Sequence, residues 1–215
     1  MNFKEFLLYF VYLLGILPLL FYLIKGSKNI SYLKFLLPFI ILMFIASIYE
    51  AIFTYILQIG TNPWFRIYSF LEFYTLLYFY WKLLNKNLLS FFFGIIYLIN
   101  YCHLIYEWIY FPRIGFNLIS SDIIITSLVL VSTIIWFIDI FKKMEESPLH
   151  INPLFYLIAA LLLCYCSSFI VFVVTDYMKQ YKMKIRDFYQ IVIFALAILR
   201  GTLTIVCWKA SRNKI

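Results

Sequence analysis

Seven long apolar runs occupy most of this 215-residue chain and constrain its fold more than any other feature. A helix needs about 20 mostly apolar residues to cross the hydrocarbon of a bilayer. The runs reach this length and lie at residues 6–24, 35–59, 64–84, 88–110, 118–141, 153–175 and 188–208. We therefore predict an all-α polytopic transmembrane bundle of seven helices, forming a single transmembrane domain over residues 1–215.

The composition excludes a water-soluble globular domain. Hydrophobic residues make up 65% of the chain and charged residues only 13%, whereas soluble domains average about 25% charged residues. Too little polar surface is available to cover a water-facing globule of this size. The lipid bilayer is therefore the partner that the composition requires, and nothing in the sequence indicates a cofactor.

A net charge of +8 raises the question of nucleic acid, but the basic residues are not arranged for it. They lie in short clusters between the apolar runs, where they flank membrane spans. We therefore expect no direct binding of nucleic acid. The four cysteines all lie inside apolar runs and indicate neither a disulfide framework nor a zinc knuckle.

The positions of lysine and arginine predict the orientation of the bundle. Cytoplasmic loops of membrane proteins carry an excess of both residues. An external N-terminus and a cytoplasmic C-terminus place ten basic residues on the inner side against seven on the outer side. The ten are Lys25, Lys28, Lys34, Lys82, Lys86, Lys142, Lys143, Lys209, Arg212 and Lys214. We expect this orientation in the inner membrane of a bacterial cell.

Several ionisable or strongly polar side chains interrupt the apolar runs. A charged side chain at the centre of a membrane helix costs at least about 2.5–3.5 kcal/mol, so each one needs a reason. Alternation of helix direction brings the candidates to the same half of the bilayer, where they could line a polar cavity that opens outside. The candidates are Glu50, Glu72, Asn100, His103, Glu107 and Asp122.

Helical periodicity groups these residues with other polar side chains. On the second predicted helix, Ser47, Thr54 and Gln58 share one stripe with Glu50 if the 3.6-residue period is kept. On the third predicted helix, Tyr68 lies on the same face as Glu72. We expect these faces to point into the bundle.

Three interpretations of the polar cluster remain open from the sequence. The first is hydrogen bonding between helices, with no function beyond packing. The second is a site for a ligand, an ion or protons. The third is a metal site for a hydrolytic zinc ion, which would need three ligands from different helices. The candidate ligands are His103, Glu107, Glu50 and Glu72.

Arg200 is a second intramembrane charge, on the last predicted helix. Two outcomes are open for it. Its long side chain can extend toward the inner surface of the membrane, or it can form an ion pair with Glu50 or Glu72.

The third predicted helix resembles part of a known family. The chain reads Asn62-Pro63-Trp64, continues through the segment 68–74 (YSFLEFY), and has Pro153-Leu154-Phe155 at the start of the sixth run. These segments resemble a family of small seven-helix bacterial membrane proteins that have a similar aromatic third helix and are often encoded beside signalling kinases. The resemblance implies a sensory or accessory role and assigns Glu72 to the family's acidic position. Size and class are also similar to small multi-pass accessory proteins of CRISPR-type defence loci.

These observations lead to one principal hypothesis about function and two alternatives. We expect a non-enzymatic membrane module that senses a signal or relays it to a cytoplasmic protein partner in bacterial signalling or antiviral defence. The alternatives are an intramembrane metal-dependent lipid hydrolase and an ion carrier or pore. A homo-oligomer is compatible with each of them. The last run has no lysine for a retinal Schiff base, and neither a P-loop nor a G-x-S-x-G motif occurs.

Overall fold

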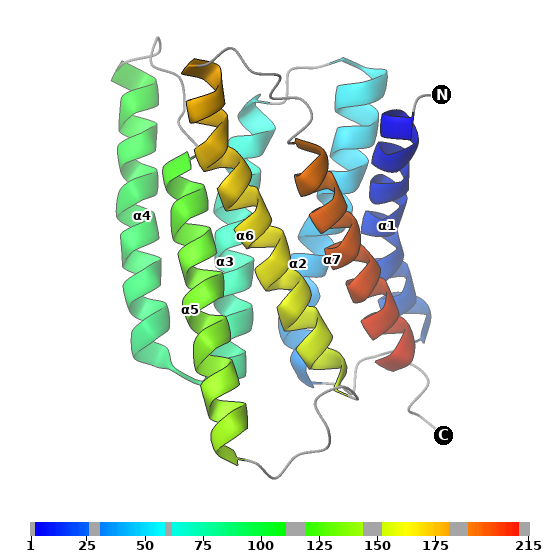
Figure 1. Ribbon diagram of the computed structural model, residues 1–215, viewed down its shortest axis with the longest axis vertical. Coiled ribbons are helices and arrows are strands. Elements are labelled where there is room, and N and C mark those ends of the chain that lie inside the picture. Colours follow the sequence, from blue (N-terminus) through cyan, green and yellow to red (C-terminus); the bar gives the residue numbers. More distant parts are fainter. Residues whose placement is uncertain are drawn as a thin grey trace.

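The computed structural model describes residues 3–25, 31–58, 62–110, 119–143, 152–180 and 189–210, which form seven long α-helices and no strand (Figure 1). The elements are α1 (Phe3–Lys25), α2 (Ser31–Tyr49), the π-helix η2 (Glu50–Ile56), α3 (Asn62–Leu84), α4 (Asn87–Tyr110), α5 (Ile119–Lys143), α6 (Pro153–Gln180) and α7 (Tyr189–Ala210). The prediction of an all-helical chain with seven long helices is thereby confirmed. The largest difference in helix bounds is the end of α6, expected at residue 175 and found at Gln180.

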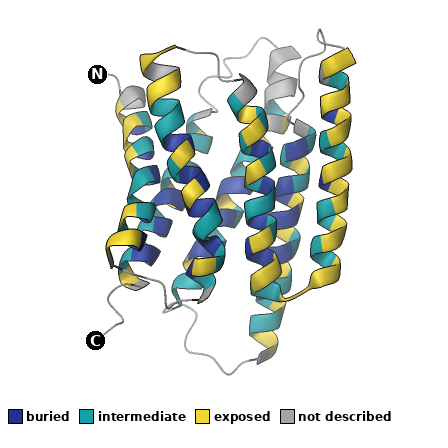
Figure 2. Ribbon diagram, turned by 180° about the vertical axis from the view of Figure 1, so that it is seen from behind, coloured by how far each residue is buried: buried dark blue, intermediate teal, exposed yellow. Residues whose placement is uncertain are grey.

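Six of the seven helices are long and apolar enough to cross a membrane, namely α1, α2, α4, α5, α6 and α7. α3 has 23 residues but is less apolar, because it carries Arg66, Glu72 and Lys82. Large hydrophobic side chains are exposed along the outside of the bundle, while the buried residues lie toward its centre (Figure 2). An outer surface of this kind is suited to lipid. The protein is a multi-pass integral membrane protein.

Six helices form a closed ring, and the seventh lies outside it. α1 packs against α2, α2 against α3, α3 against α5, α5 against α6, α6 against α7, and α7 against α1. α4 packs on the outside, against α3 and α5 (Figure 1). The ring therefore encloses the centre of the molecule without any contribution from α4.

Tyrosine side chains attach α4 to α3. The ring of Tyr97 stacks on that of Phe73 with centroids 3.8 Å apart and planes within 4°. The Tyr97 hydroxyl donates a hydrogen bond of 2.8 Å to the backbone carbonyl of Ser69. One turn further along α4, the Tyr101 hydroxyl donates to the carbonyl of Arg66 over 3.3 Å. Each tyrosine thus buries an aromatic ring and satisfies its polar end on the same neighbouring helix.

Local sequence explains where two of the helices begin or end. α3 stops before Asn85, which has φ 53° and a backbone N–H that bonds the carbonyl of Trp81. Asparagine tolerates this left-handed conformation better than most residues. α6 starts at Pro153, and the Asn152 side chain accepts a 2.9 Å hydrogen bond from the N–H of Leu154. Proline and asparagine are both favoured at these first positions of a helix.

The second predicted helix changes its hydrogen-bonding pattern at Glu50, the first of the acidic candidates. α2 ends at Tyr49, and η2 continues the same segment from Glu50 to Ile56 with the wider π pattern. The stripe expected from a 3.6-residue period is therefore not kept. Ser47 is buried, but Gln58 lies beyond η2, exposed and with φ 51°. The side chain of Thr54 lies outside the described residues.

A buried glycine allows α1 to approach two neighbours closely. A Cβ atom added at Gly15 would overlap the Ser47 hydroxyl of α2. It would also lie 3.0 Å from Nη1 of Arg200 on α7. Both distances are shorter than ordinary van der Waals contact, so this position must lack a side chain for the three helices to meet.

We expect Gly15→Ala to lower the free energy of unfolding by about 1–3 kcal/mol, because the added methyl group overpacks the interface. Gly201→Ala on α7 is the matched control, since its added Cβ has no heavy atom within 4 Å. The control should leave stability unchanged or raise it by up to about 1 kcal/mol. Chemical unfolding in detergent measures both. Equal losses in the two variants would contradict the close approach at Gly15.

Candidate functional site

A polar cavity of about 290 Å³ lies inside the helix ring. All six ring helices and η2 contribute to its lining, whereas no described residue of α4 does. Most of the lining is apolar, but three carboxylic acids and one arginine border it. They are Glu50 from η2, Glu72 from α3, Asp122 from α5 and Arg200 from α7. We refer to this space as the central cavity.

Glu72 is held in place by two tyrosines. The Tyr165 hydroxyl of α6 donates a hydrogen bond of 2.7 Å to Oε1 of Glu72. The Tyr68 hydroxyl, one turn earlier on α3, donates to the same oxygen over 3.2 Å. α3 and α6 are not neighbours in the ring, so the bond from Tyr165 joins two non-adjacent helices at the wall of the central cavity. Glu72 therefore has both a local and a long-range anchor.

The other two acids come from the neighbouring parts of the ring. Asp122 borders the central cavity together with Thr126, one turn further along α5. Thr126 is buried, and its hydroxyl donates a 3.4 Å hydrogen bond to the carbonyl of Tyr165. Glu50 accepts a hydrogen bond from Tyr12 of α1. Of the acids expected to converge from the second, third, fourth and fifth helices, Glu50, Glu72 and Asp122 thus border one cavity.

Arg200 is buried beside these acids. Its side chain is only 4% exposed, and Nη1 donates a hydrogen bond of 2.9 Å to the carbonyl of Val11 on α1. Nε has no hydrogen-bond partner in the part of the chain that the structure describes. Among the described residues, no carboxylate lies within 4.0 Å of the guanidinium group. Arg200 thus borders the cavity that contains Glu50 and Glu72 but does not contact either of them as an ion pair.

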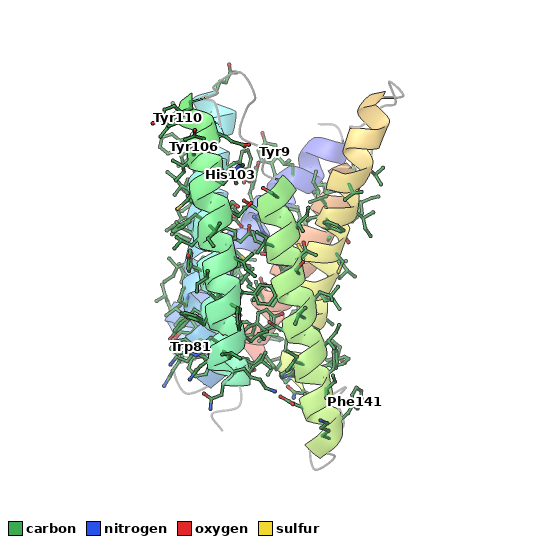
Figure 3. All side chains as sticks on the ribbon, turned by 90° about the vertical axis from the view of Figure 1, so that its left-hand side faces the viewer. Tyr9, Trp81, His103, Tyr106, Tyr110 and Phe141 are labelled. Carbon is green, nitrogen blue, oxygen red and sulfur yellow. The ribbon has the colours of Figure 1, made fainter. Side chains whose placement is uncertain are left out.

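The polar residues of α4 lie outside the central cavity, contrary to their expected place. Nδ1 of His103 lies 3.8 Å from Oε1 of Glu107, and the two side chains are 65% and 31% exposed. Asn100 is directed to α5, where its amide donates a 3.3 Å hydrogen bond to the hydroxyl of Ser121. The physical reason is the position of α4 outside the ring. Figure 3 places His103 at the end of α4 that also carries Tyr110.

The metal site considered from the sequence is not assembled. Glu50 and Glu72 border the central cavity, whereas His103 and Glu107 lie on the outer helix. Across the described part of the chain, no three His, Cys, Asp or Glu side chains are grouped closely enough to hold a metal ion. These four residues therefore do not form the metal site that a metal-dependent hydrolase would need.

Three residues at the central cavity could not be predicted from the sequence. Tyr12 and Tyr165 supply hydroxyls to the acids, and Gly15 makes room for Arg200. The chain contains 19 tyrosines, so nothing in the sequence distinguished these two from tyrosines that face lipid. A glycine within an uncharged run was the only available signal for the close approach of helices.

The chemistry of the central cavity is suited to binding. Ligand pockets are mostly apolar, with a few convergent polar groups, and have volumes of about 300–1,000 Å³. The central cavity has this character, and its volume is slightly below that range. It offers carboxyl, hydroxyl and guanidinium groups within one apolar enclosure, which suits a small polar ligand, an ion or protons.

Comparison with protein-family models, with curated proteins and with solved structures gives no match for this chain. The resemblance of the third helix to the seven-helix bacterial family therefore stays an expectation that rests on its quoted residues.

We expect Tyr165→Phe to lower the free energy of unfolding by about 1–2 kcal/mol, because Glu72 loses its shorter hydrogen bond. Tyr68→Phe should have a smaller effect, since its bond to the same oxygen is longer. Tyr106→Phe, on the exposed side of α4, is the matched control and should have none. Chemical unfolding of the three variants in detergent measures the order of their free energies of unfolding. Equal stability of Tyr165→Phe and Tyr106→Phe would be the contrary result.

Proposed function

We propose that this protein is a non-enzymatic membrane module that binds a small ligand in the central cavity and relays its presence to a cytoplasmic partner. The observation that carries the proposal is the composition of the cavity wall. Every helix of the ring contributes to it, together with η2. A ligand that contacts all of these elements can favour one arrangement of the ring over another, which is the basis of signal relay.

Two further features support a binding role. Intramembrane charges usually mark a site of ligand, ion or proton handling, and four of them meet here. The π-helix η2 begins at Glu50, and π-helical turns are frequent at functional sites. Both features concentrate at the same cavity.

The proposal places the N-terminus outside and the C-terminus in the cytoplasm of a bacterial cell. The start of α1 and the end of α7 lie at opposite ends of the bundle (Figure 1), which supports a proposal with α1 beginning and α7 ending on opposite sides of a membrane. The excess of lysine and arginine assigns the cytoplasmic side to the end of α7. A partner protein of a signalling or defence system would act on that side.

We expect Glu72→Gln to abolish the relay, because the amide replaces one carboxyl oxygen by an N–H donor inside the cavity. Glu107→Gln is the matched control, as the same substitution on the outer helix leaves the cavity intact. The readout is the set of transcripts that differ between cells lacking the gene and cells complemented with each variant. Detergent-purified Glu72→Gln protein should unfold cooperatively. A folded Glu72→Gln variant that restores the full set of transcripts would exclude the proposed site.

A proton or ion carrier is the second candidate, because three carboxyl groups from separate elements share a cavity with one arginine. Chains of intramembrane acids are typical of proton pathways. This candidate predicts a flux in proteoliposomes loaded with a pH-sensitive dye, lost in Glu72→Gln and kept in Glu107→Gln. Vesicles that stay silent with the unsubstituted chain would remove it and leave the ligand-binding module.

A further inference from the structure

The central cavity contains separated opposite charges. Arg200 is buried at its wall, and Glu50, Glu72 and Asp122 border the same space. Yet no described carboxylate approaches the guanidinium within 4.0 Å. Opposite charges in an apolar surrounding attract strongly when they touch, and a buried charge without a contact partner is unfavourable. The arrangement leaves room for a group that contacts both sides.

The basic side of the cavity lacks an acceptor. A guanidinium group has five N–H donors in a fixed plane. In Arg200, Nη1 donates to the carbonyl of Val11, whereas Nε has no hydrogen-bond partner among the described residues. Burying such a donor unpaired is unfavourable. An oxyanion is the group that pairs with a guanidinium edge through two parallel hydrogen bonds.

The acidic side lacks a donor. Tyr165 and Tyr68 both donate to Oε1 of Glu72, and Oε2 accepts no hydrogen bond from any residue that the structure describes. The two hydroxyls fix the carboxyl group while its second oxygen stays available. A primary ammonium group, with three N–H donors, is the complementary partner.

We propose that the central cavity binds a small zwitterion of the amino-acid class, with its carboxylate on Arg200 and its ammonium on Glu72. Bound in this way, the ligand converts one separated pair of charges into two contacting pairs. Phe39 and Leu199, which border the same cavity, pack against its apolar side chain. The inference rests on the proposed ligand-binding function and specifies its ligand.

The size of the cavity agrees with this class. A volume of about 290 Å³ is slightly below the usual range for drug-sized ligands, which suits a molecule as small as an amino acid. The same pair of groups, an ammonium beside an oxyanion, also occurs in the headgroup of phosphatidylethanolamine. The proposal is that the cavity binds an ammonium group together with an oxyanion. The experiment distinguishes a free amino acid from a lipid headgroup as the source of these groups.

The test measures the thermal unfolding of the purified full-length chain in phosphatidylcholine nanodiscs. Leucine is the zwitterionic probe, leucine methyl ester lacks the anion, and N-acetylleucine lacks the cation. A ligand that binds the folded state raises the unfolding midpoint in proportion to its occupancy. Leucine should raise the midpoint, with at least tenfold tighter apparent binding than either derivative. Stabilisation by the ester alone, or by the acetyl derivative alone, would overturn the proposal.

Two variants test which side chain binds the ammonium group and which binds the carboxylate of the ligand. Glu72→Gln should bind leucine and N-acetylleucine equally, because the ammonium has lost its partner. Arg200→Met should bind leucine and its methyl ester equally, because the carboxylate has lost its partner. Glu107→Gln, outside the cavity, should keep the full discrimination. A merely structural role for Glu72 would lower stability but leave the preference for the zwitterion unchanged, and Glu72→Gln carries the test alone if Arg200→Met does not fold.

A separate measurement tests phosphatidylethanolamine as the source of the zwitterion. If phosphatidylethanolamine in the nanodisc raises the midpoint and free leucine does not, the zwitterion is a lipid headgroup, and the raised midpoint must again disappear in Glu72→Gln. If neither raises the midpoint, the ligand class is wrong. The proposed relay is judged separately by the transcripts of Glu72→Gln cells, so the two failures are distinguishable.

Discussion

The hydrogen bond from Tyr165 to Glu72 joins helices on two sides of the ring, and the organisation of the interior depends on it. No water is available in the hydrocarbon of a bilayer, so a polar side chain must find its partner within the protein. α3 carries the acid and α6 carries the donor, and the space between them becomes the central cavity. On the other side of the ring, Arg200 makes the same kind of link to the backbone of α1.

The position of α4 explains why α3 can be the most polar of the seven helices. α4 packs outside the ring and covers part of α3, which therefore contacts three helices, α2, α4 and α5. Tyr97 and Tyr101 use this contact to reach backbone carbonyls of α3. α4 itself keeps a broad apolar surface, with Trp81 of the preceding helix near one end and Tyr106 and Tyr110 near the other (Figure 3). Aromatic residues at two levels are typical of membrane interfaces.

The helices could be predicted from the sequence because a bilayer imposes a minimum length on each span, and the seven apolar runs met it. The acids of the cavity could be predicted in part for the same reason, since Glu50, Glu72 and Asp122 interrupt those runs. His103 and Glu107 interrupt a run equally, yet they face outward. Periodicity shows which residues share a face, but it does not show whether that helix belongs to the ring. The partners Tyr12 and Tyr165 were hidden among many other tyrosines.

The wide turn at Glu50 has a mechanical consequence. A segment with i→i+5 hydrogen bonds contains more residues per turn than an α-helix, and its return to α geometry shifts the following chain by one position. Each position of an α-helix corresponds to about 100° of rotation. Tyr49, the residue directly before η2, stacks on Trp64 of α3 with ring centroids 4.4 Å apart, so a rearrangement of η2 that moves Tyr49 would alter this contact. The indole is thus a built-in optical probe for rearrangement at this corner of the bundle.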